Sequence, residues 1–367
     1  MKKNTFINAL RGFSALWVVV AQCCIWGGYK GYIPDPKVAV DIFMMVSGFL
    51  MMYTVNLTHK NESFVLRSNW LKFYLRRFFR ISPGYYLSLL VAIILFNIYV
   101  PSYKALGKLN NNMYLSNLSA DFSVDNVLLH VSYLFGLVPS KAFSTLLPDW
   151  SLSLEMQFYL IFPFIFLFFN KVNSHLKIIV STALIVMISV LSKKFIMHSF
   201  TESSLILYQL PMFMIGVFIY NYSEDDRNYF YVFIVAFLCL YSIVIKNHHD
   251  NAYLFFAALF LIISLNNSSL AKKINYFFDT KFFLKLSDLS FSVYLFHGFF
   301  LSILGNMIES KLYPLGYSSN QCAVLIIFLV VSLTYLFAIA IHQYIELPGM
   351  KLGKFIIKKL WVRSEIN

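Results

Sequence analysis

The first long apolar run of the chain carries two polar side chains that could take part in chemistry, Arg11 near its beginning and Gln22 near its end. In an α-helix the steps between them cover roughly 16 Å, about half the hydrocarbon thickness of a bilayer. A guanidinium and an amide would therefore lie at two depths of one membrane-spanning helix. Intramembrane polar groups are costly, so each is a candidate functional residue. For Arg11 the alternative is an interfacial anchor whose charge reaches the headgroups.

Three more ionisable residues lie in or beside other apolar runs. Asp41 begins the second run, where a carboxylate near a helix N-terminus is also favourable without any function. Glu155 lies more than a turn inside an apolar helix, where an unpaired charge would be expensive. His297 lies near the middle of a later run and could act as a base, or equally be an interhelical hydrogen-bonding contact. These side chains form the set of candidate catalytic residues.

A cluster of arginines, Arg76, Arg77 and Arg80, leads directly into the third apolar run. The planar guanidinium matches phosphate oxygens and stays charged. Together with Arg11, the cluster would suit an anionic cytosolic ligand such as a coenzyme. The alternative is a set of anchors that follow the positive-inside rule.

The elements that must position these residues are membrane helices. Hydrophobic residues make up 59% of the 367, charged residues only 13%, and the mean hydropathy of +0.67 excludes an ordinary soluble domain. The net charge is +13, and the basic residues that produce it lie between the apolar runs. This placement indicates that they interact with membrane lipids rather than with nucleic acid. The four cysteines lie inside apolar runs without metal-ligand spacing, so we expect buried thiols and no metal site.

We predict an all-α, polytopic membrane helix bundle of about ten transmembrane helices. The predicted spans are residues 9–27, 38–56, 81–100, 150–169, 176–192, 203–222, 229–245, 251–266, 286–307 and 322–345. With the N-terminus in the cytoplasm, about twice as many lysines and arginines fall inside as outside, which predicts both termini cytoplasmic. We expect one domain, residues 1–367, with no appended soluble domain and no cleaved signal.

Three segments between or beside the runs have distinct features. The stretch from Asn126 to Val138 could be a re-entrant or interfacial helix. The outer loop of about residues 101–149 is the longest polar segment and the natural place to meet an extracytoplasmic molecule. The tail after Pro348 is basic and amphipathic, which predicts a surface helix on the inner leaflet.

The chain resembles the integral-membrane acyltransferase-3 proteins of bacteria. The resemblance rests on the order and spacing of elements over nearly the whole length, since none of them is specific alone. These elements are Leu10, Arg11 and Gly12; Val40 to Phe43 with Ser47, Gly48 and Phe49; Arg77 and Arg80 before Pro83; Trp150, Ser151 and Leu152 with Glu155, Phe158 and Tyr159; Ser290, Tyr294, Leu295 and His297; and Glu346 with Pro348.

The resemblance implies an O-acyltransferase of the bacterial inner membrane that moves an acyl group, usually acetyl, from cytosolic acyl-coenzyme A to a surface glycan or lipid-linked sugar. Lipopolysaccharide O-antigen is one such glycan. It implies that arginines hold the coenzyme phosphates and that the acyl end reaches a polar site within the bundle. Direct transfer and a covalent acyl-protein intermediate both stay open. Cys23 is a conceivable acyl carrier, with a packing role as the simpler interpretation.

One position departs from the family pattern, because Gln22 stands where the family has its presumed catalytic histidine. An amide has no useful basicity, so Gln22 cannot take a proton from an attacking hydroxyl. Three explanations stay open: an inactivated variant, another base such as His297, Glu155 or Asp41, and a protein that binds without turnover. We favour the first, because the other matching elements are intact.

A transporter or flippase of a glycan or lipid-linked sugar is the alternative function. It would use the same intramembrane charges as a permeation path. Against it, the predicted spans contain no paired helices broken by Gly or Pro in corresponding halves of the chain.

Overall fold

The computed structural model describes residues 5–59, 63–170, 175–200, 202–225 and 228–362, and every regular element among them is helical. The α-helices are α1 (Thr5–Trp26), α2 (Pro36–His59), α3 (Arg67–Ile94), α4 (Phe96–Leu109), α5 (Met113–Ser116), α6 (Val124–Val131), α7 (Trp150–Asn170), α8 (His175–Phe195), α9 (Ile206–Glu224), α10 (Phe230–Lys246), α11 (Ala252–Leu265), α12 (Ser269–Phe278), α13 (Lys281–Leu312), α14 (Ser319–Ile341) and α15 (Leu347–Val362). Short 3₁₀ turns and one π-helical turn, His342–Glu346, complete the set.

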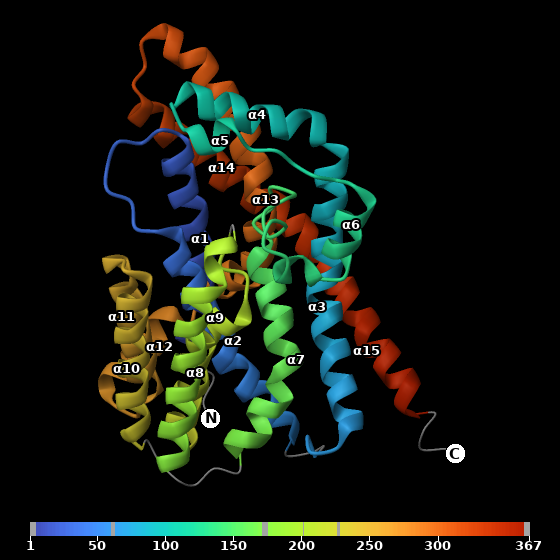
Figure 1. The fold of residues 1–367 in the computed structure, drawn as a ribbon, viewed down its shortest axis with the longest axis vertical. Helices are drawn as coiled ribbons and strands as arrows, with labels where there is room; N and C mark the ends of the chain where they lie inside the picture. The colour runs from blue at the N-terminus through green and yellow to red at the C-terminus, as the bar shows by residue number, and fades with distance from the viewer. Residues whose placement is uncertain (1–4, 60–62, 171–174, 201, 226–227, 363–367) are drawn as a thin grey trace.

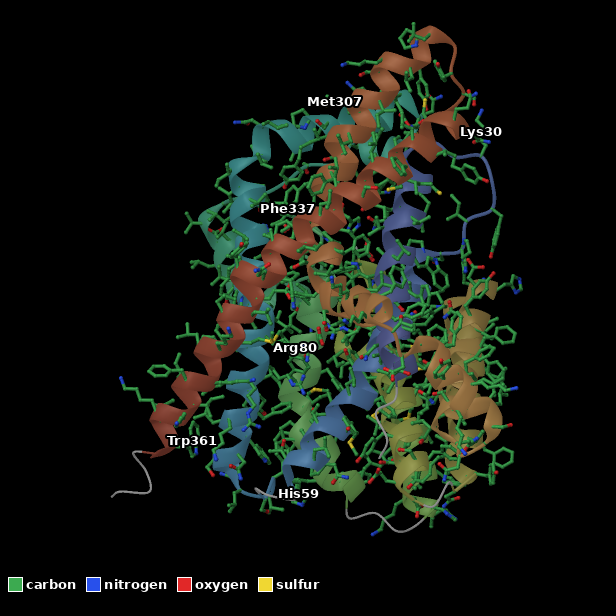
Figure 2. All side chains as sticks on the ribbon, turned by 180° about the vertical axis from the view of Figure 1, so that it is seen from behind. Lys30, His59, Arg80, Met307, Phe337 and Trp361 are labelled. Atoms are coloured by element: carbon green, nitrogen blue, oxygen red, sulfur yellow. The ribbon has the colours of Figure 1, made fainter. Side chains whose placement is uncertain are left out.

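The helices form one elongated bundle (Figure 1), as the composition predicts. Each of the ten predicted spans overlaps a helix. Among the helices of the described residues, six are long and apolar enough to cross a membrane, or eight if each of two bent pairs is one span. The count of ten spans and the cytoplasmic termini therefore stay predictions. Figure 2 labels His59 and Trp361 near the lower end of the molecule and Lys30 and Met307 near the upper end.

The third predicted span differs from the expectation at both ends. Helix α3 begins at Arg67, so the arginine cluster is part of the helix rather than of a preceding loop. At Leu95 the chain turns by 80° into α4, which crosses the upper end of the bundle (Figure 1). The stretch 126–138, expected to be a re-entrant or interfacial helix, holds most of the short helix α6 and a 3₁₀ turn, Leu134–Leu137.

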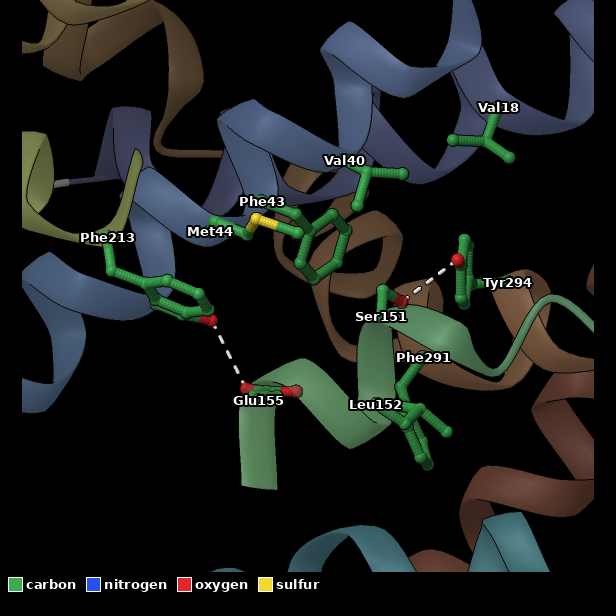
Figure 3. Close-up of a pocket in the computed structure, with 11 residues that line it drawn as sticks. Val18, Val40, Phe43, Met44, Ser151, Leu152, Glu155, Phe213, Phe291 and Tyr294 are labelled. Atoms are coloured by element: carbon green, nitrogen blue, oxygen red, sulfur yellow. Dashed lines mark hydrogen bonds between the residues drawn. The ribbon is translucent and has the colours of Figure 1, made fainter. Parts of the chain in front are cut away.

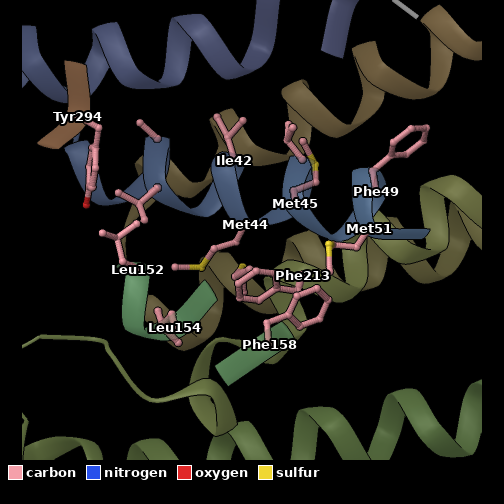
Figure 4. Packing of buried hydrophobic residues seen from close by; sticks show 14 of the residues in the cluster. Ile42, Met44, Met45, Phe49, Met51, Leu152, Leu154, Phe158, Phe213 and Tyr294 are labelled. Carbon is pink, nitrogen blue, oxygen red and sulfur yellow. The ribbon is translucent and has the colours of Figure 1, made fainter. Parts of the chain in front are cut away.

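The core centres on the crossing of α2 and α9, where backbone meets backbone. A Cβ added to Gly48 would lie 3.0 Å from the carbonyl carbon of Phe213, and one added to Gly216 would lie 2.6 Å from the amide nitrogen of Phe49. Small residues allow this approach, as is common where membrane helices cross. Around the crossing, Phe213 stacks on Phe158 of α7 with ring centroids 4.1 Å apart (Figure 4). The crossing thus fixes α2 against α7 and α9.

The C-terminal helix departs from its prediction as a surface helix. Helix α15 continues α14 through the π-helical turn and packs along α3, with Gly349 against Pro83 and Gly353 against Phe79. Two glycines four residues apart present a flat strip to α3, a feature that the alternation of lysines and apolar residues did not reveal. Glu346 of the turn is buried and binds Ser292 of α13.

Candidate active site

Four side-chain cations face a cavity of about 250 Å³ between α2, α3 and α15, which we call the arginine cavity. Its lining residues are Thr54, Val55, Thr58, Phe64, Asn69, Phe73, Arg76, Arg77, Phe79, Arg80, Met350, Gly353 and Lys354. Arg77 donates to Thr54 Oγ1 at 2.7 Å, and its guanidinium lies over the ring of Phe73. The predicted cluster of Arg76, Arg77 and Arg80 therefore lines one cavity beside the first half of α3.

Arg11 joins this cluster one step deeper. A smaller cavity of about 30 Å³ is lined by Arg11, Arg77 and Arg80 together with Glu155. The guanidinium of Arg11 lies over the ring of Phe43, 5.8 Å from its centroid. The structure thus brings together residues that lie more than 140 positions apart in the sequence, and it supplies Glu155 with cations nearby.

Glu155 is held by two hydroxyl groups. Ser47 Oγ donates to its carboxylate at 3.2 Å, and Tyr159, one turn along α7, donates to the same oxygen. Ser47 precedes Gly48, so the crossing of α2 and α9 positions this donor. Figure 3 shows Glu155 on the rim of a narrow apolar cavity of about 40 Å³.

The narrow cavity connects the carboxylate to a second pair of hydroxyl groups. Val18, Val40 and Phe43 form part of its wall, and Ser151 donates to the hydroxyl oxygen of Tyr294 at 2.9 Å (Figure 3). Tyr294 also lines the next cavity above, so it stands at the boundary between the two.

The upper cavity, about 330 Å³, is rich in aromatic side chains. Its lining residues are Val18, Gln22, Ile25, Trp26, Pro36, Lys37, Val40, Tyr103, Tyr114, Phe143, Leu146, Pro148, Trp150, Glu202, Tyr294 and Gly298. Lys37 and Glu202 form an ion pair of 3.0 Å at this cavity. Aromatic faces combined with a few polar groups are typical of a pocket for an amphipathic small molecule.

Gln22 and His297 meet at the wall of the upper cavity. His297 Nδ1 lies 2.7 Å from the carbonyl oxygen of Tyr294, and Nε2 lies 2.7 Å from Gln22 Oε1. A neutral imidazole carries one N–H, so either Nε2–H donates to Gln22 Oε1, or, with the amide of Gln22 turned over, Nδ1–H donates to Tyr294 and the NH₂ of Gln22 donates to Nε2. In both arrangements Nε2 is hydrogen-bonded to Gln22 and is not free to take a proton.

Asp41 is not part of this arrangement. Its buried carboxylate pairs with Lys246 of α10 at 2.6 and 2.5 Å, and it lines none of the cavities described above. Cys23 is also buried and lines none of them, which fits the packing interpretation. Among the residues that the structure describes, no group of three or more His, Cys, Asp or Glu could hold a metal ion.

The polar loop before α7 is anchored by a carboxylate that no sequence pattern singled out. Tyr85 donates to Asp149 Oδ2 at 3.0 Å, and His130 Nε2 lies 3.7 Å from the same oxygen. Burial lowers the pKa of His130 to about 4, so its imidazole is neutral at pH 7. This anchor holds Pro148 and Trp150, which line the upper cavity.

Sequence reasoning missed several residues of the upper cavity and one of the arginine cavity. Tyr103 lies in α4, Lys37 at the beginning of α2, and Glu202 in the segment before α9. No periodic pattern in these segments indicates that the three residues share a site. Lys354 belongs to the basic face of α15, which the sequence pattern assigned to the membrane surface. Only their meeting in three dimensions identifies them.

The four cavities share lining residues and form one series through the bundle. Arg77 and Arg80 line the first two, Ser47 and Glu155 the second and third, and Tyr294 the third and fourth. A polar series inside apolar helices defines a multi-pass membrane protein with an internal site.

The model of the acyltransferase-3 family, described as "Acyltransferase domain", matches residues 4–342. The chain therefore belongs to this family, as the sequence resemblance predicts.

Two curated relatives match part of the chain. One is the peptidoglycan O-acetyltransferase OatA of Listeria monocytogenes, 31% identical over 172 residues, which are 45% of this chain and 24% of OatA. The other is an uncharacterized protein of Haemophilus influenzae, 28% identical over 180 residues, which are 45% of this chain and 64% of the relative. The matches thus cover less than two thirds of either relative. No solved structure matches the chain.

Proposed function

We propose that this protein moves an acetyl group from cytosolic acetyl-coenzyme A to a hydroxyl of a surface polysaccharide or lipid-linked glycan, in the inner membrane of a bacterium. The observation that carries the proposal is the series of cavities from the arginine cluster to the aromatic upper cavity. A cationic cavity at one end and an aromatic one at the other suit two substrates that arrive from opposite faces. In this proposal the lower end faces the cytosol.

The donor would bind with its phosphates in the arginine cavity. Guanidinium groups bind phosphate oxygens through paired N–H donors and stay charged when partly buried. The pantetheine arm is long and thin, with two amide groups along its chain. It would follow the two small cavities of about 30 and 40 Å³, which must widen to admit it. Arg11, Arg77 and Arg80 lie at the entrance to them.

The acceptor would bind in the upper cavity. Sugar rings stack their C–H faces on aromatic side chains, and Trp26, Tyr103 and Trp150 supply such faces. The hydroxyl groups of Tyr294 and Ser151 lie between the acceptor and donor cavities. Tyr294 accepts from Ser151, so its own O–H is left to donate to the thioester oxygen as that oxygen becomes negative.

In the transfer step the acceptor oxygen bonds to the thioester carbon, the carbon–sulfur bond breaks, and the hydroxyl proton passes to a base while the coenzyme leaves as its thiolate. Gln22 cannot be that base, and Nε2 of His297 is hydrogen-bonded to Gln22. A histidine at position 22 could donate one ring N–H to His297 Nε2 and present its other nitrogen to the acceptor. We therefore propose that the chain is an inactivated variant whose active form has histidine at position 22.

One experiment tests the transferase and the inactivated variant. Purified Gln22→His protein is assayed for release of coenzyme A from acetyl-coenzyme A, with a bacterial surface-glycan extract as acceptor. We expect transfer at least about a hundredfold above the unchanged chain, the usual contribution of a general base. Adding His297→Ala to Gln22→His should remove most of that gain. Equal activity of the unchanged chain and the Gln22→His variant would refute the inactivated variant, and an absence of coenzyme binding by either protein would refute the transferase.

A further inference from the structure

Helix α15 forms one wall of the arginine cavity, although it lies outside the residues that match the family model. The match ends at residue 342, whereas α15 runs from Leu347 to Val362. Met350, Gly353 and Lys354 line the cavity from this helix. Lys354 is therefore a cation of the cavity that comes from a segment beyond the family match.

The position of Lys354 is fixed by close packing of α15 on α3. A Cβ added to Gly349 would lie 3.0 Å from Cβ of Pro83, and one added to Gly353 would lie 2.6 Å from Cβ of Phe79. Near the end of the helix, Lys72 of α3 lies over the ring of Trp361, 5.4 Å from its centroid. The backbone that carries Lys354 is thus held against α3 on both sides of this residue.

The charges around the arginine cavity are unbalanced. Arg76, Arg77, Arg80 and Lys354 line it, and no carboxylate is among the described residues that do so. The deeper cavity differs, because there Glu155 faces the arginines. Cations without carboxylate neighbours on a cavity wall indicate a site for an anion.

The four cations also differ in depth. Arg77 and Arg80 line both the arginine cavity and the deeper one, whereas Arg76 and Lys354 line only the arginine cavity. In coenzyme A the diphosphate adjoins the pantetheine arm, and a phosphate monoester on the ribose lies at the nucleotide end. With the acyl end towards Glu155, the diphosphate would meet Arg77 and Arg80 first.

We propose that Lys354, together with Arg76, binds the ribose phosphate monoester of the donor and thereby selects coenzyme A over its 3′-dephospho form. This inference rests on the proposed function, since it concerns the donor of that reaction. A phosphate monoester carries up to two charges near neutral pH, so it gains more from a pair of cations than a diester-like phosphate does.

The test compares the binding of acetyl-coenzyme A and 3′-dephospho-acetyl-coenzyme A to full-length protein by calorimetry in a neutral detergent. Lys354→Ala should weaken binding of acetyl-coenzyme A about fivefold, the effect of losing one partly exposed charge-assisted hydrogen bond. It should leave the dephospho form unchanged. Lys351→Ala is the matched control, because Lys351 is exposed on the same helix and does not line the cavity. It should change neither affinity.

An equal loss for both ligands in Lys354→Ala would overturn the inference in favour of general attraction by charge. If Lys354→Ala binds both ligands as tightly as the original protein does, the inference is also overturned. Because the original protein still binds the donor in that case, the proposed transferase function is not contradicted. No binding of either ligand by the unchanged chain would refute the transferase itself. Lys354 could instead bind a lipid phosphate. In that case Lys354→Ala would leave acetyl-coenzyme A binding unchanged in detergent and in nanodiscs, and it would reduce the amount of anionic lipid that stays bound to the protein. This result would also overturn the inference.

Discussion

The crossing of α2 and α9 makes Gly216 the residue at which the smallest change should have the largest structural effect. In Gly216→Ala the added Cβ would lie 2.6 Å from the amide nitrogen of Phe49 and closer still to the carbonyl oxygen of Met45. An ordinary contact needs about 3.5 Å or more, so the two helices must separate by roughly 1 Å. Both opposing atoms are backbone, so no side-chain rotation can relieve the contact.

The cost follows from what the separation loosens. Overpacking that forces a backbone shift costs typically about 1–3 kcal/mol, and a contact between two helix backbones belongs at the upper end of that range. For a protein of 367 residues such a loss lowers Tm by roughly 3–4 °C. The shift would also move Ser47 away from Glu155, since Ser47 lies on the same turn of α2 as Gly48.

The assay is thermal unfolding of the purified protein in detergent, with Gly305→Ala as the control. A Cβ on Gly305 would meet only the side-chain methyl groups of Leu106, at 3.1 and 3.3 Å, and these can rotate away. We expect the control to lose little stability. A Tm for Gly216→Ala within about 1 °C of the unchanged protein would refute the reasoning, because it would mean that the two helices separate at little cost in stability.

Three further predictions test other parts of the protein. Lys246→Ala leaves the buried carboxylate of Asp41 without its cation and should lower the free energy of unfolding by about 3–5 kcal/mol. The double change Asp41→Asn with Lys246→Met removes both charges and should recover most of the lost Tm. No recovery would contradict a simple ion pair. Asn110→Ala removes the donor to Glu309 at 2.6 Å and to the Trp26 carbonyl at 3.0 Å, and should lower Tm by an amount that corresponds to about 2 kcal/mol. The hydrogen bond from Lys141 lowers the pKa of Asp121, so its contribution is complete above the unfolded pKa of about 4 and is lost as the pH falls below it. Protease resistance of the loop should accordingly fall progressively as the pH drops below about 4, and Lys141→Met should abolish that pH dependence.

Local patterns in the sequence predict the helices but not their crossings. Apolar runs predict each of the ten segments, because burial in a bilayer requires a length of apolar residues that composition alone reveals. The bend at Leu95 and the packing of α15 on α3 depend on contacts with other helices. A pattern read along one segment contains no information about its partner, so α15 was predicted as a surface helix.

The candidate site divides in the same way. Arginines close together in sequence were predicted to act together, and they line one cavity. Gln22 and His297, 275 residues apart, were each identified by residue type, yet their hydrogen bond could be found only in three dimensions. That contact changes the chemistry expected of His297, since it occupies the nitrogen that would accept a proton.

Asp41 and Glu155 show why an intramembrane charge alone is a weak sign of catalysis. Both carboxylates lie inside the helix bundle, where an unpaired charge is energetically costly. Asp41, however, has a single close cation and faces no described cavity. Its charge is neutralised where it stands, so a structural role accounts for it. Glu155 instead receives two hydroxyl donors and borders cavities lined by three arginines, which a substrate with phosphates would engage. Asp41 is therefore neutralised within the protein, whereas the cations near Glu155 can also bind a ligand. This difference favours Glu155 over Asp41 as a residue of the reaction.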